Sequence, residues 1–262
     1  MNNKHDPNAY IPPKTMLVPC RSLETGAAFQ WLRSGWVDFR NARLISLTYG
    51  FVVFLLSLLV AWLSWLLGGF VLLISTLSGF VFIAPMLAFG LYSVSRQLCE
   101  GSQPTFRRTL SAIKRPLSNS MVYTLVLLVV FLLWARAGMM IQVFFPMGQH
   151  PDWGHVVTFL LIGSAVGSIF ACVSFAASVF SLPMLANRDI DVITAVISSV
   201  NGVLRNKRAM MVWAFLICFL TFVGFITAGI GLIVIIPWLA YATWHGYRAA
   251  LDVSNWNKLS GD

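Results

Sequence analysis

Histidine and aspartate side chains that could bind a metal ion lie close together in one short stretch of the sequence. His150, Asp152 and His155 fall within residues 150–155, and imidazole with carboxylate is a donor set that suits zinc or copper. Pro151 and Gly154 interrupt the regular geometry that such a set would need, and no fourth ligand is visible elsewhere. A solvated loop is therefore the favoured interpretation, with metal binding as the alternative.

The remaining polar residues do not form a recognisable catalytic or redox site. A haem between membrane helices takes axial histidines, and a proton relay takes buried Asp, Glu or Lys, but no such residue lies at the middle of an apolar run. Arg136 is the charge closest to one, and its side chain is expected to reach the outer surface. His245, beside Trp244 and Tyr247, is expected to be an interfacial anchor. The sequence therefore predicts no enzymatic activity and no cofactor.

The composition is that of a membrane protein. Of the 262 residues, 58% are hydrophobic and only 10% are charged, whereas soluble domains carry about 25% charged residues. The apolar residues lie in long uncharged blocks, which are typical of membrane-spanning helices. The net charge of +9 does not indicate nucleic acid, because the basic residues lie between these blocks, where they set orientation and meet anionic lipid headgroups.

The apolar blocks predict an all-α, polytopic membrane protein with six transmembrane helices arranged as three hairpins. Tight turns at Gly68-Gly69 and Thr227-Ala228-Gly229 make the paired helices antiparallel neighbours. We expect a disordered cytoplasmic tail over residues 1–23, one membrane domain over 24–247 and a second cytoplasmic tail over 248–262. The predicted spans are residues 44–67, 70–94, 120–145, 155–182, 209–226 and 230–247.

Each hairpin is preceded by a predicted cytoplasmic amphipathic helix at the membrane interface. The first covers residues 24–41, the second lies within the loop 95–119 and carries Phe106, Leu110, Ile113 and Leu117 on one face, and the third covers residues 187–208. Asp189 is expected to cap the third of these helices. Ordinary packing on neighbouring helices is the alternative interpretation of the first one. The apolar face of the third helix consists of Ile190, Ile193, Ile197, Val200 and Leu204. The expected basic inner surface consists of Arg107, Arg108, Lys114, Arg115, Arg205, Lys207 and Arg208.

The same module is used three times, in units of about residues 24–94, 95–186 and 187–247. The second span of each unit carries a Pro-x-Leu-Ala motif near its cytoplasmic end, beginning at Pro85, Pro183 and Pro237. Proline removes a backbone hydrogen bond and bends a helix. The three bends either shape helix packing, which we favour because proline is common in membrane spans, or open a cavity. The candidate lining of that cavity is Met86, Met184 and Trp238.

The distribution of basic residues predicts the orientation. All 18 Lys and Arg residues except Arg136 fall in the termini and in the two loops that lie on the same side as the termini. Because cytoplasmic loops carry the excess of Lys and Arg, both termini are expected in the cytoplasm.

The segments Trp31–Phe39 (WLRSGWVDF) and Ser46–Gly50 (SLTYG) resemble the DUF2189 family, which comprises predicted bacterial integral membrane proteins of unknown function. The resemblance covers most of residues 20–250 and implies a bacterial inner-membrane location. It supplies no site residues. Some members carry the label cytochrome oxidase subunit I, but the absence of histidine from the middle of the predicted spans argues against that role.

Two functions fit these observations. The first is a non-enzymatic accessory, assembly or scaffold subunit, in which small residues of span 155–182 meet a partner and the basic helices meet anionic lipid. The second is a transporter or lipid-handling protein with an apolar path between the proline-bent helices. A subunit of an oxidoreductase without a cofactor of its own is compatible with the first.

Overall fold

The computed structural model describes residues 17–66, 88–109, 117–144 and 153–257. In these ranges the chain is helical apart from short connections, which include an isolated antiparallel bridge between Cys20 and Leu251. The helices are α1 (Ala27–Asn41), α2 (Arg43–Leu66), α5 (Leu117–Phe144), α6 (Trp153–Ser178), α7 (Ser181–Asn187), α8 (Val192–Arg205), α9 (Lys207–Ile226) and α10 (Leu232–Ala250). Residues 88–99 and 106–109 are also helical. The expected all-α class is confirmed for this part of the chain.

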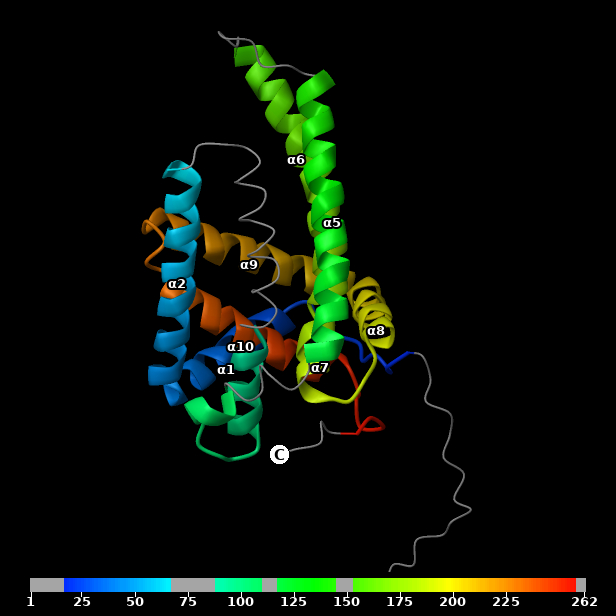
Figure 1. Ribbon diagram of the computed structural model, residues 1–262. Helices are drawn as coiled ribbons and strands as arrows, with labels where there is room; N and C mark the ends of the chain where they lie inside the picture. The colour runs from blue at the N-terminus through cyan, green and yellow to red at the C-terminus, as the bar shows by residue number, and fades with distance from the viewer. Residues whose placement is uncertain (1–16, 67–87, 110–116, 145–152, 258–262) are drawn as a thin grey trace, which may run out of the picture.

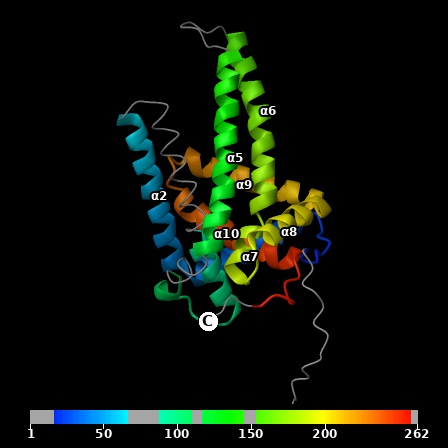
Figure 2. The same ribbon diagram turned by 45° about the vertical axis from the view of Figure 1, so that its right-hand side comes forward.

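The long helices α2, α5 and α6 rise from a base formed by α1, α7, α8 and α10 (Figure 1). The upper parts of α5 and α6 lie beside each other and stand clear of the other labelled helices in both views (Figure 2). By contrast, α9 runs across the direction of α2 and α5 in both views. The molecule thus combines a packed base with a projecting helical pair.

Three helices are long and apolar enough to cross a membrane among the described residues: Arg43–Val60, Trp153–Asn187 and Lys207–Ile226. They correspond to the predicted spans 44–67, 155–182 and 209–226. The apolar part of α5, Leu125–Met140, is shorter. Most of the predicted span 70–94 lies outside the described residues.

The predicted sixth span, residues 230–247, forms α10, which does not qualify as a candidate span. Nearly half of its residues are buried, among them Tyr241, Trp244 and Tyr247, and its C-terminal half carries His245 and Arg248. Its main neighbour is α1, and it also packs on α2, α9 and α7. This helix is therefore the centre of the packed base.

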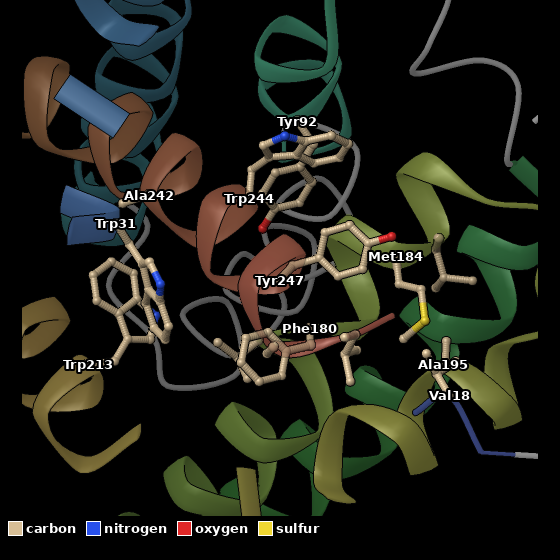
Figure 3. Packing of buried hydrophobic residues seen from close by; sticks show 14 of the residues in the cluster. Val18, Trp31, Tyr92, Phe180, Met184, Ala195, Trp213, Ala242, Trp244 and Tyr247 are labelled. Carbon is tan, nitrogen blue, oxygen red and sulfur yellow. The ribbon is translucent and has the colours of Figure 1, made fainter. Parts of the chain in front are cut away.

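Close backbone approach explains how α1 and α10 fit together. A Cβ atom added at Gly35 of α1 would lie 2.6 Å from the Ala242 backbone nitrogen, and one added at Gly246 would lie 2.9 Å from the Trp31 ring. Large aromatic side chains fill the space beside this contact. Trp31 meets Trp213 edge to face, with ring centroids 5.6 Å apart (Figure 3). Such buried aromatic pairs contribute about 0.5–1.5 kcal/mol beyond the area that they bury.

The apolar face of α1 packs mainly on the protein. Ala28, Leu32 and Phe39 are buried, whereas Phe29 is exposed. The main neighbour of α1 is α10, and α1 also contacts α9 and α2. For this helix the structure agrees with ordinary packing on neighbours, which was the alternative interpretation.

The apolar stripe of α8 has the opposite orientation. Ile193 is 71% exposed, and Ile197 and Leu204 are also exposed, whereas Ile190 is buried just before the helix begins. The buried side of α8 is formed mostly by small residues: Thr194, Ala195, Ser198, Ser199 and Gly202. An apolar face turned away from the protein is the arrangement expected of a helix that lies in the lipid interface.

The start of α8 differs from the prediction. Residues 188–191 are not helical, and Asp191, rather than Asp189, is the N-cap, with its side chain accepting a hydrogen bond from the Thr194 N–H at 2.8 Å. The Asp189 N–H instead donates to the Asn257 carbonyl at 3.0 Å. The third amphipathic helix therefore begins later than expected, because the chain first pairs with residues near 257.

A helix break lies just before Pro183, where α6 ends at Ser178 and α7 starts at Ser181. The proline ring conflicts with the carbonyl four residues earlier, at Val179. The Ser199 hydroxyl accepts from the Phe180 N–H at 3.1 Å and donates to the Ala176 carbonyl at 2.7 Å. It thereby replaces the direct bond between these two backbone groups, and such an insertion is a recognised cause of a kink.

The other two prolines of the predicted repeat provide no second example. Pro237 lies inside α10, which continues to Ala250. Pro85 lies outside the described residues. The apolar face of α1 points inward and that of α8 points outward, and α10 has no break at Pro237 like the one near Pro183. The predicted units therefore differ in structure where the described residues allow a comparison.

Candidate functional site

A buried carboxylate, Asp38, joins three segments that are far apart in the sequence. Its Oδ2 atom accepts a hydrogen bond from the Ser95 hydroxyl at 2.6 Å and lies 2.9 Å from His245 Nε2. The side chain of Asp38 is only 10% exposed and that of His245 is 23% exposed. A carboxylate this well buried needs such partners, because burying an unpaired charge is costly.

Three helices position this cluster. Asp38 is in the last turns of α1, His245 is near the end of α10, and Ser95 lies in the helical segment 88–99. The contact of Gly35 with Ala242 brings α1 close to α10 one turn away, which allows the carboxylate to reach the imidazole directly. The cluster is thus a consequence of the close packing of α1 on α10.

The order of the three groups limits their chemistry. In a catalytic triad the histidine lies between the nucleophile and the carboxylate, so that it can take the hydroxyl proton. In this cluster the carboxylate lies between Ser95 and His245, and the serine proton is donated to Asp38. The arrangement suits a structural clamp and not an activated serine.

A second polar cluster fixes the segment before α1. The Asn206 side chain accepts from the Leu23 N–H at 2.7 Å and donates to the carbonyls of Arg21 and Gly202, each at 3.1 Å. Burial raises the pKa of the nearby Cys20 thiol, so this thiol is protonated at neutral pH and is a poor nucleophile.

The same segment is tied to the chain after α10. The Arg21 N–H donates to the Ala250 carbonyl at 2.8 Å, and the Asp252 N–H donates to the Pro19 carbonyl at 2.9 Å. The Arg21 guanidinium also lies 3.0 Å from the Asp252 carboxylate and lowers the pKa of that carboxyl group to about 2. These contacts attach residues 17–23 to the packed base.

Part of the predicted basic surface forms a groove. Residues 22–25 and 204–209 line a hollow of about 720 Å³ at the junction of α8 and α9. Arg205, Lys207 and Arg208 are exposed along it, together with Glu24. Arg107 and Arg108 are exposed at a separate place, in the helical segment 106–109. Lys114 and Arg115 lie outside the described residues.

The other predicted site residues lie as follows. Met184 is fully buried in the core (Figure 3). Trp238 packs edge to face on Trp36 and donates from Nε1 to the Leu32 carbonyl at 2.8 Å. Both side chains therefore take part in helix packing. Met86 lies outside the described residues.

The candidate metal ligands are only partly described. His155 is exposed in the first turn of α6, and His150 and Asp152 lie outside the described residues. In the part of the chain that the structure covers, no three His, Cys, Asp or Glu side chains are grouped to hold a metal ion.

Sequence reasoning missed the Asp38 cluster. Asp38 is separated from Ser95 by 57 positions and from His245 by 207 positions, and no local motif links residues so far apart. Asp38 was not singled out as a site residue, and His245 was expected to be an interfacial anchor. One signal was available in the sequence: ionisable residues such as Asp38 and His245 are rare in so apolar a chain, and a rare ionisable residue usually has a partner.

Long apolar helices whose large side chains are exposed along their length, as in α2, α6 and α9, define an integral membrane protein, because such faces are stable in lipid and not in water. Residues 71–187 match the family model described as "Predicted integral membrane protein (DUF2189)". The resemblance to that family is thus confirmed, over a range that starts after the Trp31–Phe39 and Ser46–Gly50 motifs. No curated protein and no solved structure gives a significant match to the chain.

Proposed function

We propose that the protein is a non-enzymatic accessory, assembly or scaffold subunit of the bacterial inner membrane, and that α6 docks on another membrane protein. One observation carries the proposal: in the described part of the chain, no residue of the 26-residue helix α6 is buried. Its contacts are mainly with α5 and α8. Most of its surface is therefore available to lipid or to a partner.

The exposed surface of α6 includes small residues at helical spacing. Ser164, Ser168 and Ala171 are exposed and share one face, and the Ser168 hydroxyl donates to the Ser164 carbonyl at 2.7 Å. Because that hydroxyl is satisfied within its own helix, Ser168 can enter lipid or an apolar interface at little polar cost. Small residues let the backbones of two membrane helices approach closely, which makes dispersion contacts and weak hydrogen bonds possible.

The glycines of α6 support the same proposal. A Cβ atom added at Gly163 would meet nothing within 4 Å, and one added at Gly167 would meet only Trp134 Nε1, at 3.7 Å. Packing on α5 therefore does not require glycine at either position. A close approach by a helix of another protein would require it.

The topological part of the proposal is six crossings with both termini in the cytoplasm, built from three related units. The close approach of α2 and α10, where a Cβ at Gly50 would overlap the Ile233 carbonyl, supports a paired arrangement of the first and last units. The bias of Lys and Arg toward one side supports the orientation. Fusion of a reporter to each terminus tests it, and a periplasmic signal from either end would contradict it.

The docking proposal is tested by co-purification from the membrane of the source bacterium. Full-length tagged protein with Ser164→Leu and Ala171→Leu should lose its stoichiometric partner, because the larger side chains keep a facing helix away. The matched control is Ile169→Phe, which adds bulk at another exposed position of α6. Loss of the partner in the control as well, or purification of the native protein with lipid alone, would count against docking, and the second outcome would favour lipid handling.

A further inference from the structure

The groove at the junction of α8 and α9 carries a concentrated positive charge. Arg205, Lys207 and Arg208 line it with a single carboxylate, Glu24. Among the described residues, none of these three cations takes part in an ion pair or a side-chain hydrogen bond. A hollow with an excess of unpaired cations is suited to an anion.

The surroundings of the groove indicate what kind of anion it holds. Leu204, which lines it, is exposed, and Ile197 and Ile193 continue that apolar surface along α8. On the other side, α9 exposes Met211 and Phe215 directly after Lys207 and Arg208. The cations therefore lie between two apolar surfaces, at the polar end of a helix that is long and apolar enough to cross a membrane.

An anionic phospholipid has this same division of chemistry, with a phosphate headgroup attached to two acyl chains. Arg205 and Arg208 can each bind phosphate oxygens through a planar guanidinium, and Lys207 supplies a compact third charge. The first backbone N–H groups of α9 add partial positive charge at the same edge. A soluble phosphate ester would use the cations but would leave the flanking apolar side chains without a role.

We infer that the groove formed by residues 22–25 and 204–209 is a binding site for one anionic glycerophospholipid, with its phosphate among Arg205, Lys207 and Arg208 and its chains along α8 and α9. The inference rests on the membrane role proposed above and deepens it from general contact with acidic lipid to a defined site. It does not depend on docking by α6.

The test compares two variants that lose the same charge at different places. Full-length protein is placed in nanodiscs of equal parts phosphatidylglycerol and phosphatidylcholine, and native mass spectrometry counts the lipid that each protein retains. Lys207→Gln/Arg208→Gln should lower retention of phosphatidylglycerol about thirtyfold, given that each of the two basic residues contributes about 1 kcal/mol near anionic lipid. Arg107→Gln/Arg108→Gln, at the other exposed basic pair, should leave it within about twofold.

A third variant is expected to increase the retention of phosphatidylglycerol. Glu24→Gln removes the one carboxylate of the groove, so it should raise retention of phosphatidylglycerol about two- to fivefold by relieving repulsion of the headgroup. A purely structural role of these residues would not increase lipid binding.

The outcomes separate the site from its alternatives. Equal loss in both double variants, or no loss in either, overturns the groove as a lipid site and leaves the scaffold function intact if the partner still co-purifies. Displacement of phosphatidylglycerol by millimolar glycerol 3-phosphate alone would assign the groove to a soluble phosphate ester and overturn the lipid. If the native protein does not fractionate with membranes, the membrane role itself fails.

Discussion

The Ser199 hydroxyl takes the hydrogen bond that Phe180 would otherwise donate within a continuous helix. It accepts a hydrogen bond from the Phe180 N–H at 3.1 Å and donates one to the Ala176 carbonyl at 2.7 Å. Pro183 and Ser199, 16 positions apart, therefore maintain one structural feature: the break between α6 and α7. Proline makes a straight helix unfavourable there, and serine satisfies the backbone groups that the break separates.

The first prediction concerns this pair. Ser199→Ala should lower the free energy of unfolding by about 1–3 kcal/mol, since it leaves buried backbone groups unpaired. In a Pro183→Ala background the same change should cost less, because the helix can then close the direct bond between Phe180 and Ala176. Denaturant titrations of the four proteins in detergent micelles measure the coupling, and strictly additive costs would contradict it.

The second prediction follows from the contact of Gly35 with Ala242. A methyl group at Gly35 would lie 2.6 Å from a backbone atom that cannot rotate away, so Gly35→Ala should force α1 and α10 apart. We expect a loss of about 1–3 kcal/mol of stability. Gly26→Ala is the matched control, because an added Cβ there meets nothing within 4 Å. Similar thermal unfolding midpoints for the two variants would show that the helices tolerate separation.

The third prediction concerns the buried carboxylate. Asp38→Ala should cost about 2 kcal/mol, because the Ser95 hydroxyl and the His245 ring lose a charged acceptor. Combining it with His245→Ala should give a coupling free energy of about 1 kcal/mol between the two residues. Asp252→Asn is the control, since its partner Arg21 is mostly exposed, and it should not change stability measurably. A coupling free energy near zero would contradict the view that Asp38 and His245 hold α1 and α10 together.

The fourth prediction is a pH dependence at the start of α8. Burial raises the pKa of Asp191, but the hydrogen bonds that it accepts from Thr194 and its neighbours lower that pKa by more, so the folded value lies below the ordinary 3.8. A carboxyl with a lowered pKa stabilises the fold above its unfolded pKa, and this contribution disappears as the pH falls through the folded value.

The measurement for Asp191 compares two substitutions. Asp191→Ala should cost about 1 kcal/mol at neutral pH through loss of the cap. Asp191→Asn keeps an acceptor and loses only the charge, so its smaller deficit should begin to shrink as the pH falls below about 4 and vanish below the folded pKa of Asp191. Asp189→Asn serves as the control, because the cap of α8 is not Asp189. A deficit of Asp191→Asn that persists at low pH would contradict the assignment.

Periodicity in the sequence identified the helices, but it did not show whether the apolar face of each helix points toward the protein or away from it. The stripe through Ile193, Ile197 and Leu204 was correctly placed on one face of α8, and the structure turns it outward. The residues that pack inward, such as Ser198 and Gly202, are small, and small residues carry little hydropathy signal. In α1 the apolar face packs on α10 instead. The two outcomes follow from neighbours that a local pattern cannot contain.

The candidate sites were predictable only where the chemistry was local. The adjacent cations Lys207 and Arg208 were recognised as part of a basic surface, but the groove also needs residues 22–25, which are brought there by the Asn206 amide. Asp38 and His245 come together only after α1 has packed on α10. Both sites therefore depend on contacts between the first and last parts of the sequence, which the local pattern of residues does not encode.

The pairing of residues 19–21 with residues 250–252 imposes an order on biosynthesis. Arg21 leaves the ribosome 231 positions ahead of Asp252, a delay of roughly 10–50 s at about 5–20 residues per second. During that time the early segment has no strand partner, while apolar helices made after it are already entering the bilayer. Closure of this short ladder is consequently one of the last steps of maturation, and a chain stalled before residue 250 would present the unpaired segment to proteases and chaperones.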